Sequence, residues 1–236
     1  MHYDFKARLN KLDSSQYRNI LVPDIDRKLN EAANILVKAL AMPKYAKEIG
    51  LEVNQRTIDD LRTILIDDSP LVATTVNNID YFVNLPITTP TEYMYYVSSK
   101  VLMNRPSCGN KVCDRVIVRR HDEEHKNSPF NISSFEWREV NIHFINNQIR
   151  IFTDGTFSIV KLDLSYIRKM LYMHNAQDYS SGTYTLPNGV VLVGSQDCEL
   201  PETIHTDVID LAVLLTTMEI NGMDYQLKQA KIQLNQ

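Results

Sequence analysis

The stretch LPETIHTDVIDLAVLLTTMEIN, residues 200–221, decides the fold predicted for this chain. Pro201 suits the first position of a helix, where its missing N–H costs nothing, and Glu202 lies at the positive end of the helix dipole. Apolar side chains recur every three or four positions and form one face, Ile204, Val208, Leu211, Leu215 and Met218. A second set widens this face to two sides, Ile209, Val213 and Leu214. The helix is therefore expected to pack against more than one element and to end at Asn221-Gly222.

Two helices are predicted near the N-terminus. The first is short and breaks at residues 13–15, and its apolar face consists of Phe5, Leu9 and Leu12. The second begins near Pro23 and should end near Met42, because Pro43 follows. Its expected buried stripe consists of Ile25, Leu29, Ala32, Leu36 and Leu40. Stripes with this spacing are typical of core packing.

A third helix is predicted from Thr57, a candidate N-cap, through Leu65, with the run 67–70 (DDSP) ending it. From residue 81 onward, β-branched and aromatic residues dominate, as is typical of strands. Strands are predicted at 81–86, 91–103, 112–119, 140–144, 149–152, 157–167, 183–185 and 190–193. The predicted turns between strands are Asn146-Asn147, Asp154-Gly155 and Pro187-Asn188-Gly189.

Helices at both ends with a run of antiparallel strands between them indicate an α+β fold. We expect a helical layer from the N- and C-terminal segments, with an inserted antiparallel β-module of sandwich or barrel-like form. The expected parts are residues 1–80, the N-terminal helical part; 81–197, the β-module; and 198–236, the C-terminal helices. The two-sided helix at 200–221 needs partners, and the N-terminal helices are the ones able to supply them.

Composition narrows the class of protein. The chain has 236 residues, 44% of them hydrophobic, and a net charge near −4, which argues against nucleic-acid binding through bulk charge. The N-terminus lacks the apolar core of a signal peptide, and the longest apolar run, 211–215, is far shorter than the ~20 residues of a membrane span. Three cysteines do not make a disulfide framework, so we expect synthesis and folding in the cytoplasm.

One group of residues has the ligand types of a tetrahedral zinc site, Cys108, Cys113, His121 and His125. Only seven residues separate the second cysteine from the first histidine, and they include the strand-like run VIVRR instead of the start of a zinc-finger helix. The favoured interpretation is a hairpin turn at 108–113 and a solvated loop at 121–126. A zinc-stabilised regulator that binds nucleic acid through these four residues remains the alternative function.

Two further polar groups have competing interpretations. The loop 121–125 (HDEEH) could hold a hard divalent cation for hydrolysis through Asp122, Glu123 and Glu124, or it is a charged loop tip. Neighbouring carboxylates on such a loop point in different directions, which favours the loop tip. A second potential ligand set lies on the C-terminal helix, where the same residues also supply the polar stripe of a surface helix, His205, Asp207 and Asp210. We favour the solvated helix face.

Motifs for catalysis and phosphate binding do not occur in the chain. It contains no GxxxxGK[ST], GxGxxG, GxSxG or HExxH motif, and its 7 glycines leave little room for a backbone phosphate cradle. The basic pairs Arg119-Arg120 and Arg168-Lys169 are too sparse for a nucleic-acid footprint. The aromatic strand 91–97 (TEYMYYV) is expected in the sheet core or in a subunit contact, although its rings could stack on bases. We predict no catalytic, cofactor or metal site and no enzymatic activity.

Three stretches resemble the ring-forming neck proteins of tailed bacteriophages, particularly short-tailed and crAss-like phages. They are YRNILVPDIDRKLNEAANILVKAL (17–40), LDLSYIRK (162–169) and LPETIHTDVIDLAVLLTTMEIN (200–221). In that family the closing helix typically begins with Leu-Pro-Glu, and the β-module returns to the helices just before it. The order of helices, inserted strands and closing helix is similar to the adaptor of the tail tubular protein A type.

The resemblance implies a structural role in the virion. Such proteins form a homo-oligomeric ring, commonly of twelve copies, below the portal protein, and they join neighbouring ring or tail proteins. Genomic DNA passes through the lumen without sequence-specific binding. The resemblance implies no catalytic residue, no cofactor and no membrane contact, and it leaves open whether the ring is the adaptor directly under the portal or a later collar. A ring subunit needs two different faces that close by rotation.

Overall fold

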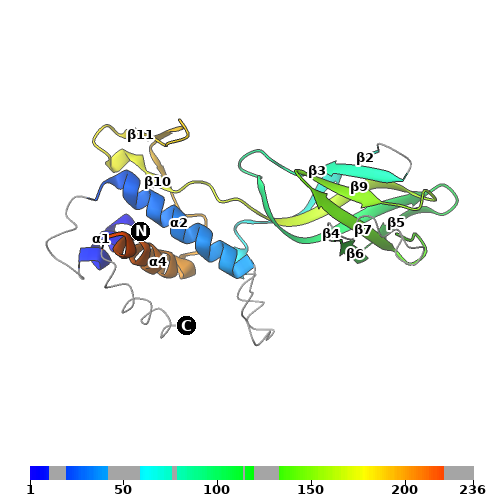
Figure 1. The fold of residues 1–236 in the computed structure, drawn as a ribbon, viewed down its shortest axis with the longest axis horizontal. Coiled ribbons are helices and arrows are strands. Elements are labelled where there is room, and N and C mark those ends of the chain that lie inside the picture. Colours follow the sequence, from blue (N-terminus) through cyan, green and yellow to red (C-terminus); the bar gives the residue numbers. More distant parts are fainter. Residues whose placement is uncertain (11–19, 42–58, 76–78, 114, 120–132, 221–236) are drawn as a thin grey trace, which may run out of the picture. The chain divides into compact units, whose positions relative to one another are not determined.

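The computed structural model describes residues 1–10, 20–41, 59–75, 79–113, 115–119 and 133–220 (Figure 1). The fold is α+β, as predicted. The chain divides into two compact units. The helical unit comprises Met1–Ile64 and Met170–Gln236, and the β-unit comprises Leu65–Lys169. The unit boundaries lie after residues 64 and 169, not after residues 80 and 197 as expected. The β-unit is one continuous segment, inserted into a helical unit made from both ends of the chain.

The helical unit contains helices α1 (His2–Asn10), α2 (Val22–Ala41) and α4 (Glu202–Ile220). α1 buries Phe5 and Leu9 completely or almost completely, as their spacing predicts. α2 and α4, blue and orange in Figure 1, lie side by side. Ion pairs join Lys28 on α2 with Glu219 on α4, and Arg8 on α1 with Asp210 on α4. α4 therefore contacts both α1 and α2.

The buried side of α4 differs in part from the predicted face. Ile204 and Val208 are buried, but Leu211 and Leu215 are half-buried and Met218 is exposed. The second predicted set, Ile209, Val213 and Leu214, is buried, and so are Ala212, Thr216 and Thr217, which the prediction did not include. The two threonines are buried at little cost because each hydroxyl donates to the carbonyl four residues earlier, at 2.8 and 2.6 Å. The predicted end of the helix at 221–222 lies outside the described residues.

Short strands complete the helical unit after the β-unit. β10 (His174–Asn175) pairs with β13 (Ser195–Gln196), and a 3-10 helix, η2, follows at Ala176–Asp178. β11 (Thr183–Thr185) and β12 (Val191–Val193) form an antiparallel hairpin. Its turn lies at residues 187–189, as predicted, and Gly189 has a φ of +85°, which glycine adopts without strain.

The described residues of the β-unit form two sheets. The first has the order β1 (Leu65–Val72), β9 (Ser158–Arg168), β4 (Tyr93–Arg105) and β5 (Gly109–Cys113). The second has the order β2 (Thr74–Thr75), β3 (Asp80–Asn84), β8 (Gln148–Phe152), β7 (Glu139–Ile145) and β6 (Arg115–Val118). Every pair is antiparallel except β6 with β7, which is parallel.

Both sheets contribute to one hydrophobic core. The first sheet supplies Val101, Met103, Ile159, Leu162, Leu164 and Tyr166. The second supplies Tyr81, Val83, Val140, Ile142, Ile149 and Ile151. Burial alternates along β8, so Ile149 and Ile151 enter the core, whereas β9 buries four consecutive residues near its end, 164–167.

The prediction of a third helix through Leu65 is wrong. Residues 59–61 are helical, but residues 65–72 form β1, in which Leu65 pairs with Ile167 of β9. A register shift lies between Ile66 and Ser69, and Asp68 adopts a φ of +47° there. Pro70 is tolerated because β1 is an edge strand, where a missing N–H breaks no ladder. The expected N-cap, Thr57, lies outside the described residues.

The single strand predicted at 112–119 is also wrong. Residues 112–113 belong to β5 and residues 115–118 to β6, and these strands lie in different sheets. Cys113 ends β5 in the core, and β6 then runs beside β7 with Val116 packed against the same core. A strand that changes sheets keeps its apolar alternation, so periodicity alone cannot reveal the break.

Candidate functional site

The structure does not bring Cys108 and Cys113 together. Cys108 is exposed in the turn that precedes β5, whereas Cys113 is buried at the far end of that strand. Because an extended strand rises ~3.4 Å per residue, β5 separates its two ends by ~14 Å, while zinc holds each thiolate at ~2.3 Å. The Cys113 thiol instead donates to the carbonyl of Arg138 at 2.6 Å. His121 and His125 lie outside the described residues.

The other two candidate ligand sets, for which a loop tip and a solvated helix face were favoured, are only partly within the described residues. The HDEEH loop, with Asp122, Glu123 and Glu124, lies outside the described residues. On α4, Asp207 is exposed, and the ring of His205 lies 2.9 Å from the carbonyl of Leu200. Asp210 pairs with Arg8, so the three residues do not converge on one point. Among the described residues, no group of three or more His, Cys, Asp or Glu is placed to hold a metal ion.

Two rings of the aromatic strand, Tyr93 and Tyr96, are partly buried and pack against the core of the β-unit. The ring of Tyr93 stacks on Phe144 with centroids 6.1 Å apart, and Tyr96 meets the same ring edge-on at 5.4 Å. Burial raises the pKa of Tyr93 to about 12. Of the basic pairs, Arg119 donates to the side chain of Asn141, and Lys169 lies 3.2 Å from Glu92, while Arg120 is outside the described residues.

A buried polar network around Asp26 holds the helical unit together. Asp26 on α2 is completely buried, and its Oδ1 lies 2.6 Å from Nε2 of His2 on α1. Its Oδ2 accepts hydrogen bonds from the Tyr184 hydroxyl at 2.6 Å and from the backbone N–H of Asn175 at 3.1 Å. Burial, reinforced by Asp26, raises the pKa of Tyr184 above its ordinary value. The network joins α1, α2 and the segment that follows the β-unit.

Asn30 extends this network one helical turn further along α2. Its side-chain amide donates to the carbonyl of Met173 at 2.7 Å and accepts from the Met173 N–H at 2.9 Å. The amide therefore replaces a strand partner for residue 173. Sequence analysis missed the role of Asp26 as the centre of this network. An acidic residue in the first turn of a helix is usually explained by the helix dipole. The other residues that bind Asp26 are distant from it in sequence.

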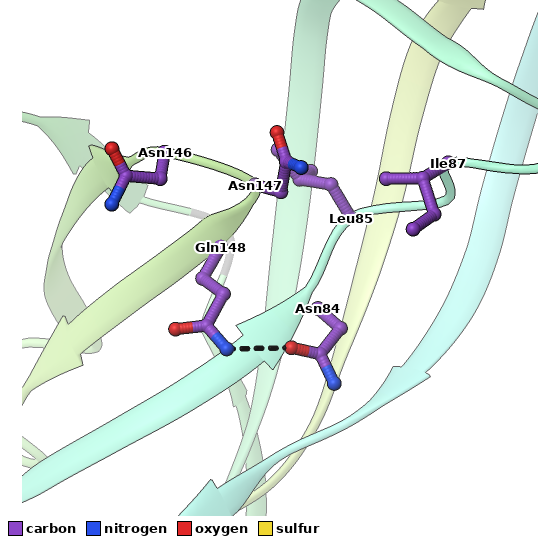
Figure 2. Close-up of a pocket in the computed structure, with 6 residues that line it drawn as sticks. All are labelled: Asn84, Leu85, Ile87, Asn146, Asn147 and Gln148. Carbon is purple, nitrogen blue, oxygen red and sulfur yellow. Dashed lines mark hydrogen bonds between the residues drawn. The ribbon is translucent and has the colours of Figure 1, made fainter.

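The β-unit carries a small open hollow, which we call the amide hollow (Figure 2). It has a volume of about 370 Å³ and is lined by Asn84, Leu85, Ile87, Asn146, Asn147 and Gln148. The Nε2 of Gln148 donates to Oδ1 of Asn84 at 2.8 Å, a bond drawn as a dashed line in Figure 2. Asn84 is the last residue of β3, and Gln148 is the first residue of β8. Leu85 is buried, whereas Ile87 is 64% exposed. The hollow thus combines an apolar surface with several primary amides.

The indole loop, residues 134–139, lies directly before β7 and presents the chain's single tryptophan. Trp137 is 81% exposed. The loop is closed by two backbone hydrogen bonds between Ser134 and Glu139, at 2.8 and 3.1 Å. Phe135 is buried in the core below it, and Glu136 forms an ion pair with Arg105 at 2.8 Å. A well-fixed loop therefore holds a large aromatic side chain in solvent.

Sequence analysis missed both features. The segments that form them have no periodicity, and their positions depend on the ends of β3, β7 and β8. The available signals were the single tryptophan and the amide-rich run Asn146-Asn147-Gln148.

No helix in the described part of the chain is both long and apolar enough to cross a lipid bilayer. The chain matches no protein-family model and no curated protein.

Proposed function

We propose that this protein is the subunit of a homo-oligomeric ring at the portal–tail junction of a tailed bacteriophage, an adaptor or collar that lines the channel for DNA exit. The observation that carries the proposal is the division of the chain. Helices from both ends pack together through α4, and a continuous β-unit is inserted between them. This is the order of parts expected from the resemblance of the three stretches to neck proteins.

The proposed subunit acts by shape and assembly. The helical unit supplies a stiff element, since ion pairs join α1 and α2 to α4 and the buried Asp26 network joins α1 to α2. The β-unit, a sandwich or barrel-like module in this proposal, supplies surfaces for neighbouring proteins. Its partners are other copies of the chain, the portal protein and adjoining tail proteins, and genomic DNA passes through without sequence-specific contacts.

Both units carry large apolar side chains that are exposed, which supports the proposal that the protein contacts neighbouring proteins in an assembly. In the helical unit they include Tyr3, Leu21, Val191 and Val193, and in the β-unit Val72, Ile87 and Trp137. Scattered exposed residues of this kind are ordinary on a protein surface, but an 81% exposed tryptophan on a fixed loop is typical of a protein–protein interface.

Electron microscopy of the purified full-length chain tests the proposal. We expect closed rings of uniform diameter, and labelled antibodies should locate the chain at the neck of phage particles that carry it. Val208→Asp, which places a carboxylate at a completely buried position of α4, should abolish the rings, whereas Val72→Asp at an exposed position should be tolerated. A monomer at all concentrations that is also absent from purified particles would refute the proposal.

A further inference from the structure

We propose that His174 is a pH-sensitive latch in the helical unit. It ties the β11–β12 hairpin to β10 through two backbone carbonyls when its imidazole carries two protons, and it gives up one of these contacts when the imidazole is neutral. The proposal goes beyond the proposed assembly and does not depend on it, because it rests on the positions of the two nitrogens of this side chain.

Both nitrogens of the His174 imidazole face carbonyl oxygens. Nδ1 lies 3.2 Å from the carbonyl of Tyr172, and Nε2 lies 3.3 Å from the carbonyl of Val193. A carbonyl oxygen only accepts hydrogen bonds, so each nitrogen needs a proton in order to bind. The imidazolium has a proton on each nitrogen, whereas neutral imidazole has one proton in either tautomer. Only the charged form of His174 therefore makes both contacts.

The contact with Val193 joins two strands that are not paired with each other. β10, which carries His174, pairs with β13, whereas β12, which ends at Val193, pairs with β11. A neighbouring hydrogen bond runs from the Gln177 N–H to the Gly194 carbonyl at 3.0 Å and does not involve the imidazole. Loss of the His174 contact should therefore loosen the hairpin without detaching it.

Acidic groups lie close to His174 in the chain and across from it. Asp26 on α2 accepts the backbone N–H of Asn175 at 3.1 Å, and Asp178 of η2 accepts from the Asn175 side chain at 2.5 Å. β12 and β13 contain no ionisable side chain. The other ionisable groups of the adjoining segments are acidic or uncharged at neutral pH, Tyr172, Tyr179, Tyr184, Asp197, Cys198 and Glu199. A cation at His174 thus has acidic neighbours.

The basic side chains of the adjoining helix have other partners or lie far along it. Arg27 and Lys28 on α2 each form an ion pair with Glu219 of α4. Lys38 lies in the last turn of α2, ~18 Å beyond Asp26 at the rise of a helix. The geometry of the two carbonyls therefore decides the behaviour of the latch.

Hydrogen–deuterium exchange of the full-length chain tests the latch. Exchange of residues 190–196 is compared between wild type and His174→Gln at pH ~5.5 and pH ~8.5, on either side of the range in which histidine changes charge. A glutamine side chain combines one donor group with one acceptor oxygen at every pH, as neutral imidazole does. At the lower pH the variant should exchange ~5-fold faster or more, because one hydrogen bond is missing, and at the higher pH the two proteins should exchange alike.

His205→Gln is the matched control. The imidazole of His205 on α4 lies 2.9 Å from the carbonyl of Leu200, and one proton is enough for this contact. Its replacement should leave exchange of residues 190–196 unchanged at both pH values. Circular dichroism checks that both variants fold. For His174→Gln, an equal effect at both pH values, a larger effect at the higher pH, or no effect at either would overturn the proposal.

Nuclear magnetic resonance of the wild type observes the two protons directly and needs no variant. At pH ~5.5 both N–H protons of the His174 imidazole should give signals, with contacts to Tyr172 and Val193, and one signal should vanish by pH ~8.5. A single N–H at the lower pH, or two at the higher pH, would overturn the latch. Neither result bears on the proposed assembly, which electron microscopy tests.

Discussion

The hydroxyl of Tyr184 donates a 2.6 Å hydrogen bond to Oδ2 of Asp26, although 158 residues separate the two in the chain. The whole β-unit lies between these two residues in the sequence. The bond joins α2 to the β11–β12 hairpin, which comes after the β-unit. Asp26 is completely buried, and a buried carboxyl group without hydrogen-bond donors would destabilise the helical unit.

Tyr184→Phe should destabilise the protein by about 1.5–3 kcal/mol, because it removes a hydrogen bond to a buried charged group. Urea unfolding followed by circular dichroism measures the change. Tyr179→Phe is the matched control, since this neighbouring ring packs edge-on against Tyr184 and its hydroxyl has no hydrogen-bond partner among the described residues. Equal losses in the two variants would contradict the assigned role of the bond.

The stability of the protein should fall as the pH rises above about 10, where tyrosines of the unfolded chain ionise. Burial raises the pKa of Tyr93 to about 12, and burial also raises the pKa values of Tyr166, Tyr172 and Tyr184. The folded protein therefore keeps protons that the unfolded chain releases, so this contribution is complete below pH ~10 and is lost as the pH rises through the raised pKa values. Thermal unfolding at several alkaline pH values measures the decline.

Absorbance titration gives an independent check on the same groups. The chain has 12 tyrosines, and the four whose pKa values burial raises should ionise after the exposed ones, together with loss of the folded circular dichroism signal. A single transition near pH 10 in protein that is still folded would show that these four rings are not shielded as the structure indicates.

Glu219→Gln should destabilise the protein by ~0.5–1 kcal/mol, a modest value because Glu219 is 56% exposed and solvent screens its pair with Lys28. The hydrogen bond from Lys28 lowers the pKa of the Glu219 carboxyl. For Lys28, burial disfavours the charge, but hydrogen bonds and the charges of Glu219 and Glu31 outweigh it and raise the pKa.

The pH dependence of this pair has a definite sign. A carboxyl with a lowered pKa contributes its stability above the ordinary value of ~4.3 and loses it as the pH falls through the lowered pKa. The difference between wild type and Glu219→Gln should therefore vanish in acid. Asp207→Asn, at an exposed position of the same helix, is the control and should cost almost nothing at any pH.

The three thiols should react with a thiol reagent in the order Cys108, Cys198, Cys113. Cys108 is exposed, burial raises the pKa of the half-buried Cys198, and Cys113 is in the core. Reaction rates of the wild type and of Cys108→Ser separate the fast phase from the others. Protection of Cys108 by added zinc would contradict the separation of the two cysteines along β5.

Asn146→Ala should destabilise the β-unit by ~1–2 kcal/mol, whereas Asn146→Gly should be neutral or stabilising. Asn146 adopts a φ of +52° in the β7–β8 turn, a conformation that costs alanine about this much and glycine nothing. Urea unfolding at low protein concentration measures the effect. Asn147→Ala is the control, and a similar loss there would mean that packing, not the left-handed backbone, explains the result.

The sequence was sufficient for elements whose signals are local. Periodicity predicts α2 and α4, which begin within two residues of the predicted starts, and Asn146-Asn147 and Pro187-Asn188-Gly189 predict two hairpins. β1 was mistaken for the end of a helix because DDSP has no strand character, and the strand exists through its pairing with β9. Tertiary pairing overrides local propensity there.

The candidate sites could not be predicted from the sequence because the residues that form them come from distant parts of the chain. The partners of Asp26 lie 24, 149 and 158 residues away, and no spacing rule connects such positions. The exposure of Trp137 follows from how Phe135 anchors its loop, and the amide hollow exists because the β3–β4 connection passes the β7–β8 turn. The zinc alternative, which the sequence did not favour, needs Cys108 and Cys113 close together, and the extended strand β5 holds them apart.

The pairing of Leu65 with Ile167 also bears on how the chain is made and how it could be shortened. When the inserted segment folds, its first and last strands, β1 and β9, pair side by side. If it folds during synthesis, before α4 is made, the long loop between α2 and α4 is already closed. Little further loop-closure entropy is then lost when α4 packs against α2. By the same geometry, a few-residue turn could replace the entire insert, and the helices should still find one another as an independent miniature protein.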